Sequence, residues 1–359
     1  MPVLLGAVAV LVACTVTASG RPVRPRPAYH PPPVRHVFVI NLENKGYAET
    51  FGSGSKAPYL AKTLRGKGAL LTRYYGVAHH SLPNYLAQVS GQGPNAQTQG
   101  DCAVYSRFHR TGTVAPGQAV GNGCVYPRSV RTVADQLVKH GLTWRGYMQD
   151  MGRGCRHPRL GTRDRTQGAR VGDQYATKHN PFVYFRSITA HHRTCARRDV
   201  GLRHLTDDLR HVRTTRNLSY ITPNLCNDGH DSPCVDGRAG GLRSANAWLR
   251  KWVPRILRSP AFAKNGLLVV TFDEADGSAS ACCGEGPGPN APMPGIEGPG
   301  GGRVGAVVVS PFVQPGTRSR TAYNHYSLLR TIEDYFGLGH LGYAKRARHF
   351  GADVYGASG

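Results

Sequence analysis

Two pairs of oxygen-bearing side chains each follow directly on a run of apolar residues. Glu43 and Asn44 follow one run near the start of the chain, and Asp273 and Glu274 follow a second run near its end. Carboxylate and carboxamide oxygens are hard ligands of the kind that divalent cations prefer. Either pair alone could instead cap the turn or helix that comes next. Two pairs of the same form favour one shared site for a divalent metal ion.

A serine is the candidate nucleophile. Ser81 stands two residues before Pro83, at the start of an apolar helical pattern, which is the sequence form of a helix N-terminus. The free N–H groups and the dipole of such a terminus favour bound anions, so a phosphoryl group attacked by Ser81 would also be held there. For a lone serine the competing interpretation is a plain helix cap, and the neighbouring His79 and His80 favour chemistry only slightly.

A third cluster of reactive side chains lies between two cysteines. Asp228, His230 and Asp231 follow a predicted strand, and such residues could ligate a metal, hold phosphate or donate a proton. The alternative is an Asx-rich turn with only a structural role. His325 opens a later helical pattern, and on its own it is more typical of a capping or core residue.

The apolar periodicity predicts the elements that position these groups. Strands are predicted at residues 36–40, 70–75, 143–148, 218–222, 267–272 and 304–309. Helices are predicted at residues 59–65, from Ser81, from a cap at Ser129, at 202–212, at 245–256 with a kink or break at Pro254, and at 325–336. This alternation predicts an α/β fold with a largely parallel central sheet. Because ligands bind at the carboxyl ends of such strands, both acidic pairs are expected at that edge.

The charge balance indicates anionic partners. The 359 residues carry a formal net charge of +24 and have a pI of about 10.1. Such a balance favours phosphates, acidic lipid surfaces or nucleic acid. The basic residues are scattered and form no RNA-binding signature, so a specific nucleic-acid reader is not expected.

The first residues predict export. Residues 1–20 contain a short apolar run and end in Ala18-Ser19-Gly20, which is typical of a cleaved signal peptide. Residues 21–35 are rich in proline and arginine and are predicted to be a linker, which leaves residues 36–359 as one catalytic domain. The alternative to secretion is lipid anchoring at Cys14, because the preceding residues resemble a lipobox.

The cysteine count agrees with export. Nine cysteines are present, and without Cys14 an even number remains to form disulfides. We expect the pairs Cys102–Cys124, Cys155–Cys195 and Cys226–Cys234, which leaves the neighbours Cys282 and Cys283 as a fourth pair. A structural zinc site is the alternative, but no Cys-x-x-Cys pair has a matching partner.

Five motifs, taken in order, resemble a known family. They are LENKGY at 42–47, HSLPNYL at 80–86, PNLCNDGHD at 223–231, TFDE at 271–274 and YNHYSLLRTIE at 323–333. Together they resemble a bacterial phosphoesterase family that holds secreted acid phosphatases and phospholipases C. Within it the chain is most similar to the secreted acid phosphatases, a branch that includes a phosphatidylinositol 3-phosphate phosphatase.

The resemblance implies an alkaline-phosphatase-like α/β/α sandwich and metal-assisted phosphoryl transfer. It implies metal ligands at Glu43, Asn44, Asp273, Glu274 and Asp231, a nucleophile at Ser81, an acid at His230, and substrate contacts at His80, Asn84, Asp228 and His325. The number and identity of the metal ions stay open. Small phosphomonoesters or phosphoinositides are the expected substrates, with contact to anionic membrane surfaces.

The resulting prediction is an exported phosphomonoesterase of the acid phosphatase type. One alternative is a phosphodiesterase of the phospholipase C kind, whose metal site could be nearly identical. A second is a basic binding protein, without activity, for anionic lipid or envelope polymer. This second alternative explains the charge but not the acidic residues at the strand ends.

Overall fold

The structure, a computed structural model, describes residues 30–295 and 298–356. The predicted signal peptide, Cys14 and most of the 21–35 linker lie outside these residues. Among the residues described, no helix is both long enough and apolar enough to cross a bilayer.

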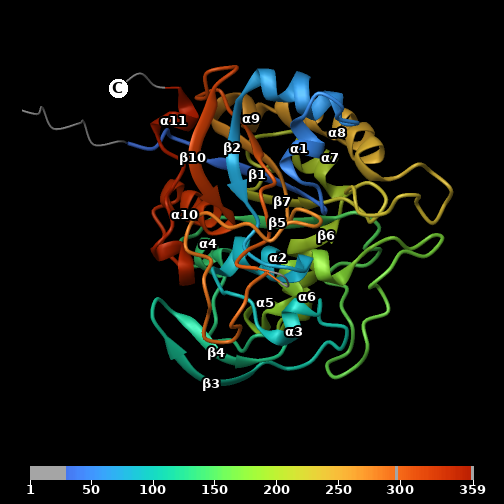
Figure 1. The fold of residues 1–359 in the computed structure, drawn as a ribbon, viewed down its shortest axis with the longest axis vertical. Coiled ribbons are helices and arrows are strands. Elements are labelled where there is room, and N and C mark those ends of the chain that lie inside the picture. The colour runs from blue at the N-terminus through green and yellow to red at the C-terminus, as the bar shows by residue number, and fades with distance from the viewer. Residues whose placement is uncertain (1–29, 296–297, 357–359) are drawn as a thin grey trace, which may run out of the picture.

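A sheet of eight strands forms the middle layer (Figure 1), in the order β10-β2-β9-β8-β1-β7-β5-β6. The strands are β1 His36–Leu42, β2 Ala69–Tyr75, β5 Trp144–Met148, β6 Asp199–Gly201, β7 Leu218–Thr222, β8 Gly266–Phe272, β9 Ala306–Val309 and β10 Arg318–Asn324. Only β9 pairs antiparallel to its neighbours β2 and β8. The predicted largely parallel sheet is therefore confirmed. A separate hairpin joins β3 His109–Val114 to β4 Gln118–Asn122.

The two central strands β1 and β8 align the acidic pairs. Both strands are buried along their whole length, which explains their nearly continuous apolar sequences. They pair in parallel from His36 opposite Gly266 to Leu42 opposite Phe272. Because this register has no slip, the residues that follow, Glu43 and Asp273, leave the sheet side by side.

Helices cover both faces of the sheet. In β1, Asn41 accepts a hydrogen bond from Gln88 of α2, whereas Phe38 packs against Phe262 of α9. Side chains at odd and even positions of a strand point to opposite faces, so α2 and α9 lie on opposite sides of the sheet. Helices α4 and α10 pack with α2, and α8 and η1 pack on the side of α9. The α/β/α layering is confirmed.

The helices have the following bounds: α1 Tyr47–Phe51, η1 Tyr59–Leu64, η2 Arg65–Lys67, α2 Ser81–Ser90, α3 Ala96–Gln99, α4 Val133–Lys139, η3 Thr177–His179, η4 Pro181–Tyr184, α5 Arg186–Thr189, α6 His192–Arg198, α7 His204–Asp208, α8 Gly241–Leu257, α9 Pro260–Asn265, α10 His325–Tyr335, η5 Gly342–Lys345 and α11 Ala352–Tyr355. Pro254 lies inside α8. The predicted helix at 202–212 is much shorter than expected, and the segment at 59–65 forms a π-helix.

The predicted start of α4 is wrong. Its cap is Thr132 rather than Ser129, because Thr132 and Asp135 exchange hydrogen bonds in a capping box that satisfies two N–H groups. Strand β10 and the β3–β4 hairpin were not predicted, since β10 is polar at alternate positions and the hairpin is mostly exposed. Neither therefore has the apolar pattern that identifies a strand.

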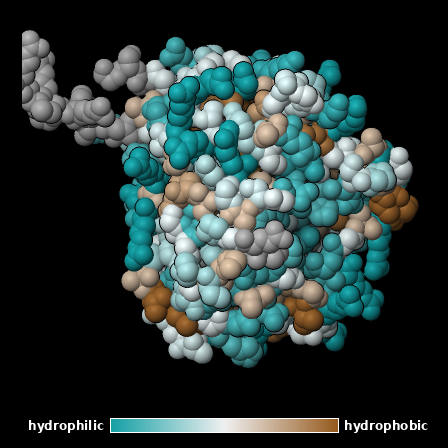
Figure 2. All heavy atoms as spheres, in the orientation of Figure 1, coloured by the Kyte–Doolittle hydropathy of each residue, from teal (hydrophilic) through white to brown (hydrophobic). Residues whose placement is uncertain are grey.

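The four expected disulfides are present. Cys102–Cys124 and Cys155–Cys195 tie the two long irregular segments, and Cys226–Cys234 closes the turn after β7. Cys282 and Cys283 form the vicinal pair. The face of the molecule in Figure 2 is mainly hydrophilic, with apolar residues in small separate groups.

Candidate active site at the carboxyl edge of the sheet

Ser81 and Glu43 meet at the centre of this edge. Ser81 is the first residue of α2 and is 1% exposed, and its hydroxyl donates to Glu43 Oε2 at 2.9 Å. Tyr85, one turn further along α2, donates its hydroxyl to Glu43 Oε1. The N-terminus of α2 therefore faces the end of β1, and the Glu43 carboxylate orients the serine oxygen.

The two predicted acidic pairs come together, as their positions at the ends of β1 and β8 require. Asn44 adopts a φ of 52°, and its N–H donates to Asp273 Oδ1 at 3.0 Å. One terminal atom of the Asn44 amide lies 3.3 Å from both Asp273 Oδ1 and Glu274 Oε1. If that atom is nitrogen, it donates to both carboxylates. If it is oxygen, three oxygens face one another, and a cation between them would relieve the repulsion.

A second group of ligand atoms shares Glu43. Glu43, His179 and Asp228 each place one oxygen or nitrogen within 4.8 Å of the others. His179 Nε2, Asp228 Oδ2 and Asp273 Oδ2 are buried and lack a hydrogen-bond partner within the described part of the chain. Buried polar atoms are normally paired. These atoms, with the nearby carboxylates of Asp273 and Glu274, form a set of oxygen and nitrogen donors that suits a divalent cation.

The pKa shifts of these side chains agree with a site for a divalent cation. Burial raises the pKa of Glu43 and Asp228 well above their usual values, and the neighbouring carboxylates add to the effect. Burial likewise raises the pKa of Asp273 to about 7. The pKa of His179 is lowered well below its usual value by burial and by nearby Lys178. A neutral imidazole beside crowded acids has the protonation state of a metal ligand.

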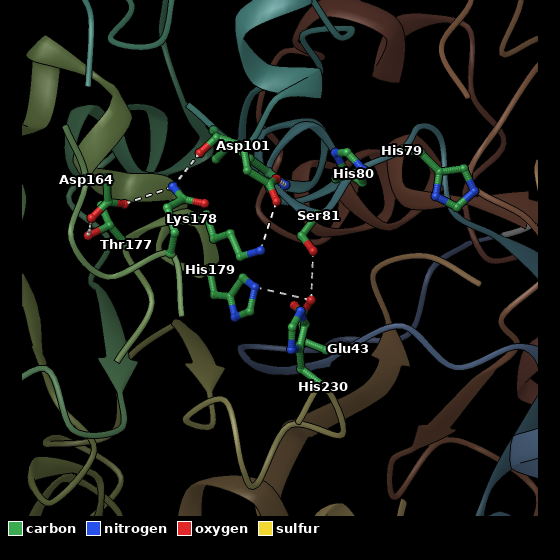
Figure 3. Close-up of polar contacts among 12 residues, drawn as sticks. Glu43, His79, His80, Ser81, Asp101, Asp164, Thr177, Lys178, His179 and His230 are labelled. Atoms are coloured by element: carbon green, nitrogen blue, oxygen red, sulfur yellow. Dashed lines mark hydrogen bonds and ion pairs between the residues drawn. The ribbon is translucent and has the colours of Figure 1, made fainter. Parts of the chain in front are cut away.

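Lys178 brings positive charge to the start of α2. Its Nζ lies 2.9 Å from Asp101 Oδ2, and Asp101 Oδ1 accepts the Leu82 N–H at 2.9 Å. Burial opposes the charge of Lys178, but Asp101 and the site carboxylates outweigh burial and raise the pKa of the ammonium group. Figure 3 shows Lys178, Asp101 and His179 on one side of Ser81 and His79 on the other.

The loop before Ser81 is held by Asn84. The Asn84 amide accepts from the N–H groups of Val77 and Ala78 and donates to the carbonyls of Ala78 and His80. The amide was predicted to contact substrate, but its hydrogen-bonding groups are all engaged in this loop. Its contribution to the site is therefore to position the loop.

A cavity of about 280 Å³ opens beside these groups. It is lined by Asn44, His79, His80, Glu274, Asp276, Gly277, Ser278 and Ala279. His79 pairs with Glu274, and the exposed His80 uses Nδ1 to bond the Gln99 carbonyl at 2.7 Å. The cavity gives solvent access to the predicted metal ligands.

The turn after β7 places His230 near the site. The ring centroid of His230 lies 6.1 Å from that of His179, and its Nδ1 lies 2.8 Å from Asp231 Oδ1. Asp231 is thus paired with His230 and belongs to neither group of clustered ligand atoms, contrary to its predicted metal role. Asp228 lies deeper, where its Oδ1 accepts the His230 N–H.

His325 lies behind the site. It is fully buried, and its Nε2–H donates to the Asp273 carbonyl at 2.5 Å. Its Nδ1 lies 3.1 Å from both the Tyr74 hydroxyl and Gln88 Nε2. Burial lowers its pKa to about 4, so the ring is neutral near pH 7. His325 supports the backbone of Asp273, and the predicted substrate contact would require exposure that the ring lacks.

Sequence reasoning missed His179, Lys178, Tyr85 and Asp101. The chain has 16 histidines, and the segment that contains His179 has little periodicity, so residue type alone could not single it out. Tyr85 lies one helical turn after Ser81, and this spacing is the one signal that could have found it.

Sequence comparisons found relatives of this chain among known proteins. A sequence model of the Phosphoesterase family matches residues 53–339. The phosphate-repressible acid phosphatase of Penicillium chrysogenum is 27% identical over 77% of this chain and 54% of its own length. An acid phosphatase of Aspergillus fumigatus is 28% identical over 85% of this chain and 55% of its own length. The chain thus spans about half the length of these fungal relatives. The phosphatidylinositol-3-phosphatase of Mycobacterium tuberculosis is 27% identical over 88% of this chain and 81% of its own.

Solved structures share the fold. A protein of the alkaline phosphatase superfamily from Vibrio parahaemolyticus aligns with a TM-score of 0.48 at 11% identity, over 85% of this chain and 67% of its own. The structure of Ps i-CgsB in complex with k-i-k-neocarrahexaose aligns with a TM-score of 0.51 at 12% identity. The alignment covers 90% of this chain and 76% of that protein's chain. The alignment with Ps i-CgsB shows that this chain shares the fold of that protein. The match of the family model over most of the chain shows that this protein belongs to the Phosphoesterase family.

Proposed function

We propose that the protein is an exported, metal-assisted phosphomonoesterase of the acid phosphatase type, with Ser81 as its nucleophile. The observation that supports it most is the buried Ser81 hydroxyl, which lies at a helix N-terminus and donates to Glu43 within a cluster of buried carboxylates. The names of the relatives point to the same reaction. The four disulfides agree with an oxidising compartment outside the cytoplasm.

The carboxylates of Glu43, Asp273 and Glu274 would hold a divalent cation, with the His179 and Asp228 group beside it; Asn44 would join them in the orientation that turns its amide oxygen toward the carboxylates. When bound, such an ion supplies positive charge that stabilises the transferring phosphoryl group and lowers the pKa of a nearby hydroxyl. Lys178 and the N-terminus of α2 add further positive potential on the other side of Ser81.

The chain's own residues perform the transfer in two steps. Ser81 Oγ attacks phosphorus, and its proton has an acceptor in Glu43 Oε2. The bond to the leaving oxygen breaks, and His230, which Asp231 orients, protonates that oxygen. Water then attacks the phosphoserine and gives a proton to His230, the bond between phosphorus and Ser81 Oγ breaks, Glu43 returns its proton to that oxygen, and inorganic phosphate leaves.

Replacement of Ser81 tests this function. We expect Ser81→Ala to lower kcat for p-nitrophenyl phosphate by at least about 10³-fold, because no other hydroxyl takes its place. Ser90→Ala, at the other end of α2, is the matched control and should keep turnover. EDTA should abolish activity and added divalent metal should restore it. Normal turnover by Ser81→Ala would overturn the proposal, and faster hydrolysis of bis(p-nitrophenyl) phosphate would favour the phosphodiesterase instead.

The leaving group tests His230. We expect His230→Asn to lower kcat for glycerol phosphate by about 10²-fold but for p-nitrophenyl phosphate much less, because p-nitrophenolate leaves without a proton. The measurement is the ratio of the two rates in wild type and variant. Equal losses on both substrates would assign His230 to binding and not to proton transfer.

A further inference from the structure

A second and larger cavity, of about 680 Å³, lies beyond β7 at the same edge of the sheet. It is lined by Gln149, Asp150, Met151, Gly152, Gly172, Gly201, Leu202, Arg203, Asn227, Arg238, Ala247, Trp248, Lys251 and Trp252. These residues follow β5 and β6, or belong to the turn after β7 and to α8, and both β6 and α8 lie on the right-hand side of Figure 1. With strands about 4.8 Å apart, β5 and β6 end roughly 10–15 Å from β1. The cavity is therefore within reach of one extended substrate.

One wall of this cavity is aromatic. Trp248 and Trp252 are one turn apart on α8, and their ring centroids lie 6.0 Å apart. Both side chains are largely buried against the core, with one surface toward the cavity, and Met151 and Leu202 extend the apolar wall. Such rings favour contact with an apolar or aromatic body.

Among the charged residues of the lining, three are cationic and one is acidic. Arg203 and Lys251 are exposed, and neither has an acidic partner within the residues described by the structure. Arg238 is paired with Asp236 and also donates to Asn227 Oδ1 at 3.1 Å. The one acid in the lining, Asp150, accepts from Asn224. Two cations without acidic partners among residues 30–295 and 298–356 lie beside two indole rings. This combination suits a ligand whose anionic group is attached to an apolar or aromatic moiety.

The cavity and the candidate active site share the turn after β7. Asn224 donates to Asp150 on the cavity side and accepts the Asn227 N–H. The next residue, Asp228, is in the group of ligand atoms with Glu43, and His230 follows two residues later. A ligand in the cavity would therefore lie against the same turn that positions His230.

We propose that this cavity binds the far end of the substrate: a second anionic group joined to an apolar or aromatic body, while the terminal phosphomonoester lies at Ser81. The inference rests on the proposed function and adds a substrate class to it. A phospholipid headgroup and a nucleotide both have this chemistry, and the experiment separates the two.

Tryptophan fluorescence gives a binding test that needs no turnover. The chain has three tryptophans, so in a Ser81→Ala, Trp144→Phe protein only the two cavity tryptophans emit. Three probes are titrated: dibutanoyl phosphatidylinositol 3-phosphate, adenosine 3′,5′-bisphosphate and inorganic phosphate. We expect a saturable change in emission with the lipid or with the nucleotide, which identifies the substrate class, but not with phosphate. Calorimetry on the Ser81→Ala protein, with Trp144 intact, guards against a folding defect from the second substitution.

The cations provide the decisive variants. In the Ser81→Ala background, Arg203→Gln and Lys251→Gln should each raise Kd for the responding probe at least fivefold. Arg250→Gln changes the neighbour of Lys251 on α8, does not line the cavity, and should leave Kd unchanged. Equal affinity in all variants, or no binding of either organic probe, would overturn the inference. If probes bind but the wild-type enzyme hydrolyses no phosphomonoester, the proposed function falls and the cavity assignment stands.

Discussion

Two sets of buried carboxylates differ in how they are paired. Asp208, on α7, accepts from Arg145 Nη1 at 2.5 Å and from the Tyr147 hydroxyl at 2.6 Å, with Arg216 nearby. At the strand ends, Glu43, Asp228 and Asp273 crowd together, and two of them have an oxygen without a hydrogen-bond partner. A buried charge with cationic partners serves the fold, whereas crowded acids without them destabilise it. The proposed cation would compensate the second arrangement, since strained or unpaired groups are retained where function needs them.

The largest expected effect concerns Glu43. Glu43→Gln keeps the size of the side chain but removes a charge, so we expect kcat for p-nitrophenyl phosphate to fall about 10³-fold. In EDTA, however, its Tm should equal or exceed that of the wild type, because the substitution relieves repulsion from Asp273 and Asp228. Thermal unfolding in EDTA and turnover with added metal check the two parts. A lower Tm of the variant in EDTA would mean that Glu43 stabilises the fold. Glu43 would then act as Asp208 does, and the proposed difference between the two groups of carboxylates would be wrong.

Asp208 should show the opposite behaviour. Asp208→Asn leaves Arg145 and Arg216 without a carboxylate in a largely buried place, so we expect a loss of about 2–3 kcal/mol in the free energy of unfolding. The kcat of the folded variant should remain that of the wild type. Urea unfolding followed by a turnover assay at low denaturant tests both statements, and a large loss of kcat without loss of stability would contradict them.

Asp199 is an intermediate case, because only one of its two carboxylate oxygens has a hydrogen-bond partner among the residues that the structure describes. It is fully buried, accepts from Asn180 through Oδ2, and has no partner for Oδ1 in the described residues. Burial raises its pKa to about 7, above its ordinary value of 3.8. The folded state therefore retains this proton longer than the unfolded chain does, and stability from this group is lost as the pH rises from about 4 to about 7.

Asp199→Asn removes this dependence. We expect the variant to gain stability over the wild type as the pH rises through that range, by up to about 3 kcal/mol above pH 7. Urea unfolding at pH 4.5, 6 and 8 measures the difference, with Asp207→Asn on the exposed surface as the control. A difference that does not change with pH would show that Asp199 is ionised in the folded protein.

The fold was largely predictable from local patterns, and the site only in part. Mainly apolar runs identified β1, β7 and β8, because strands buried on both faces have few polar positions. Ser81 was recognised as a helix start from Pro83 and the apolar residues that follow. Helix ends were less predictable, as the cap at Thr132 shows, since neighbouring residues of similar type compete for that role.

The remainder of the site depends on contacts between distant segments. His179 and Lys178 come from an irregular segment without periodicity, and they reach Glu43 and Asp101 only because Cys155–Cys195 and η3 fold that segment over α2. His325 was predicted to contact substrate, but its burial, which decides what it can touch, is a property of packing.

The sequence by itself determined the largely parallel sheet, the two acidic pairs at its edge and the serine at a helix start. These follow from residue type and from spacing over a few positions, where local geometry governs. The tertiary structure alone decided which acids stay unpaired, that Asp231 turns to His230, that His179 joins Glu43, and that a cationic, tryptophan-lined cavity lies beside the site. Burial and charge pairing depend on which segments pack together, and no single segment contains that information.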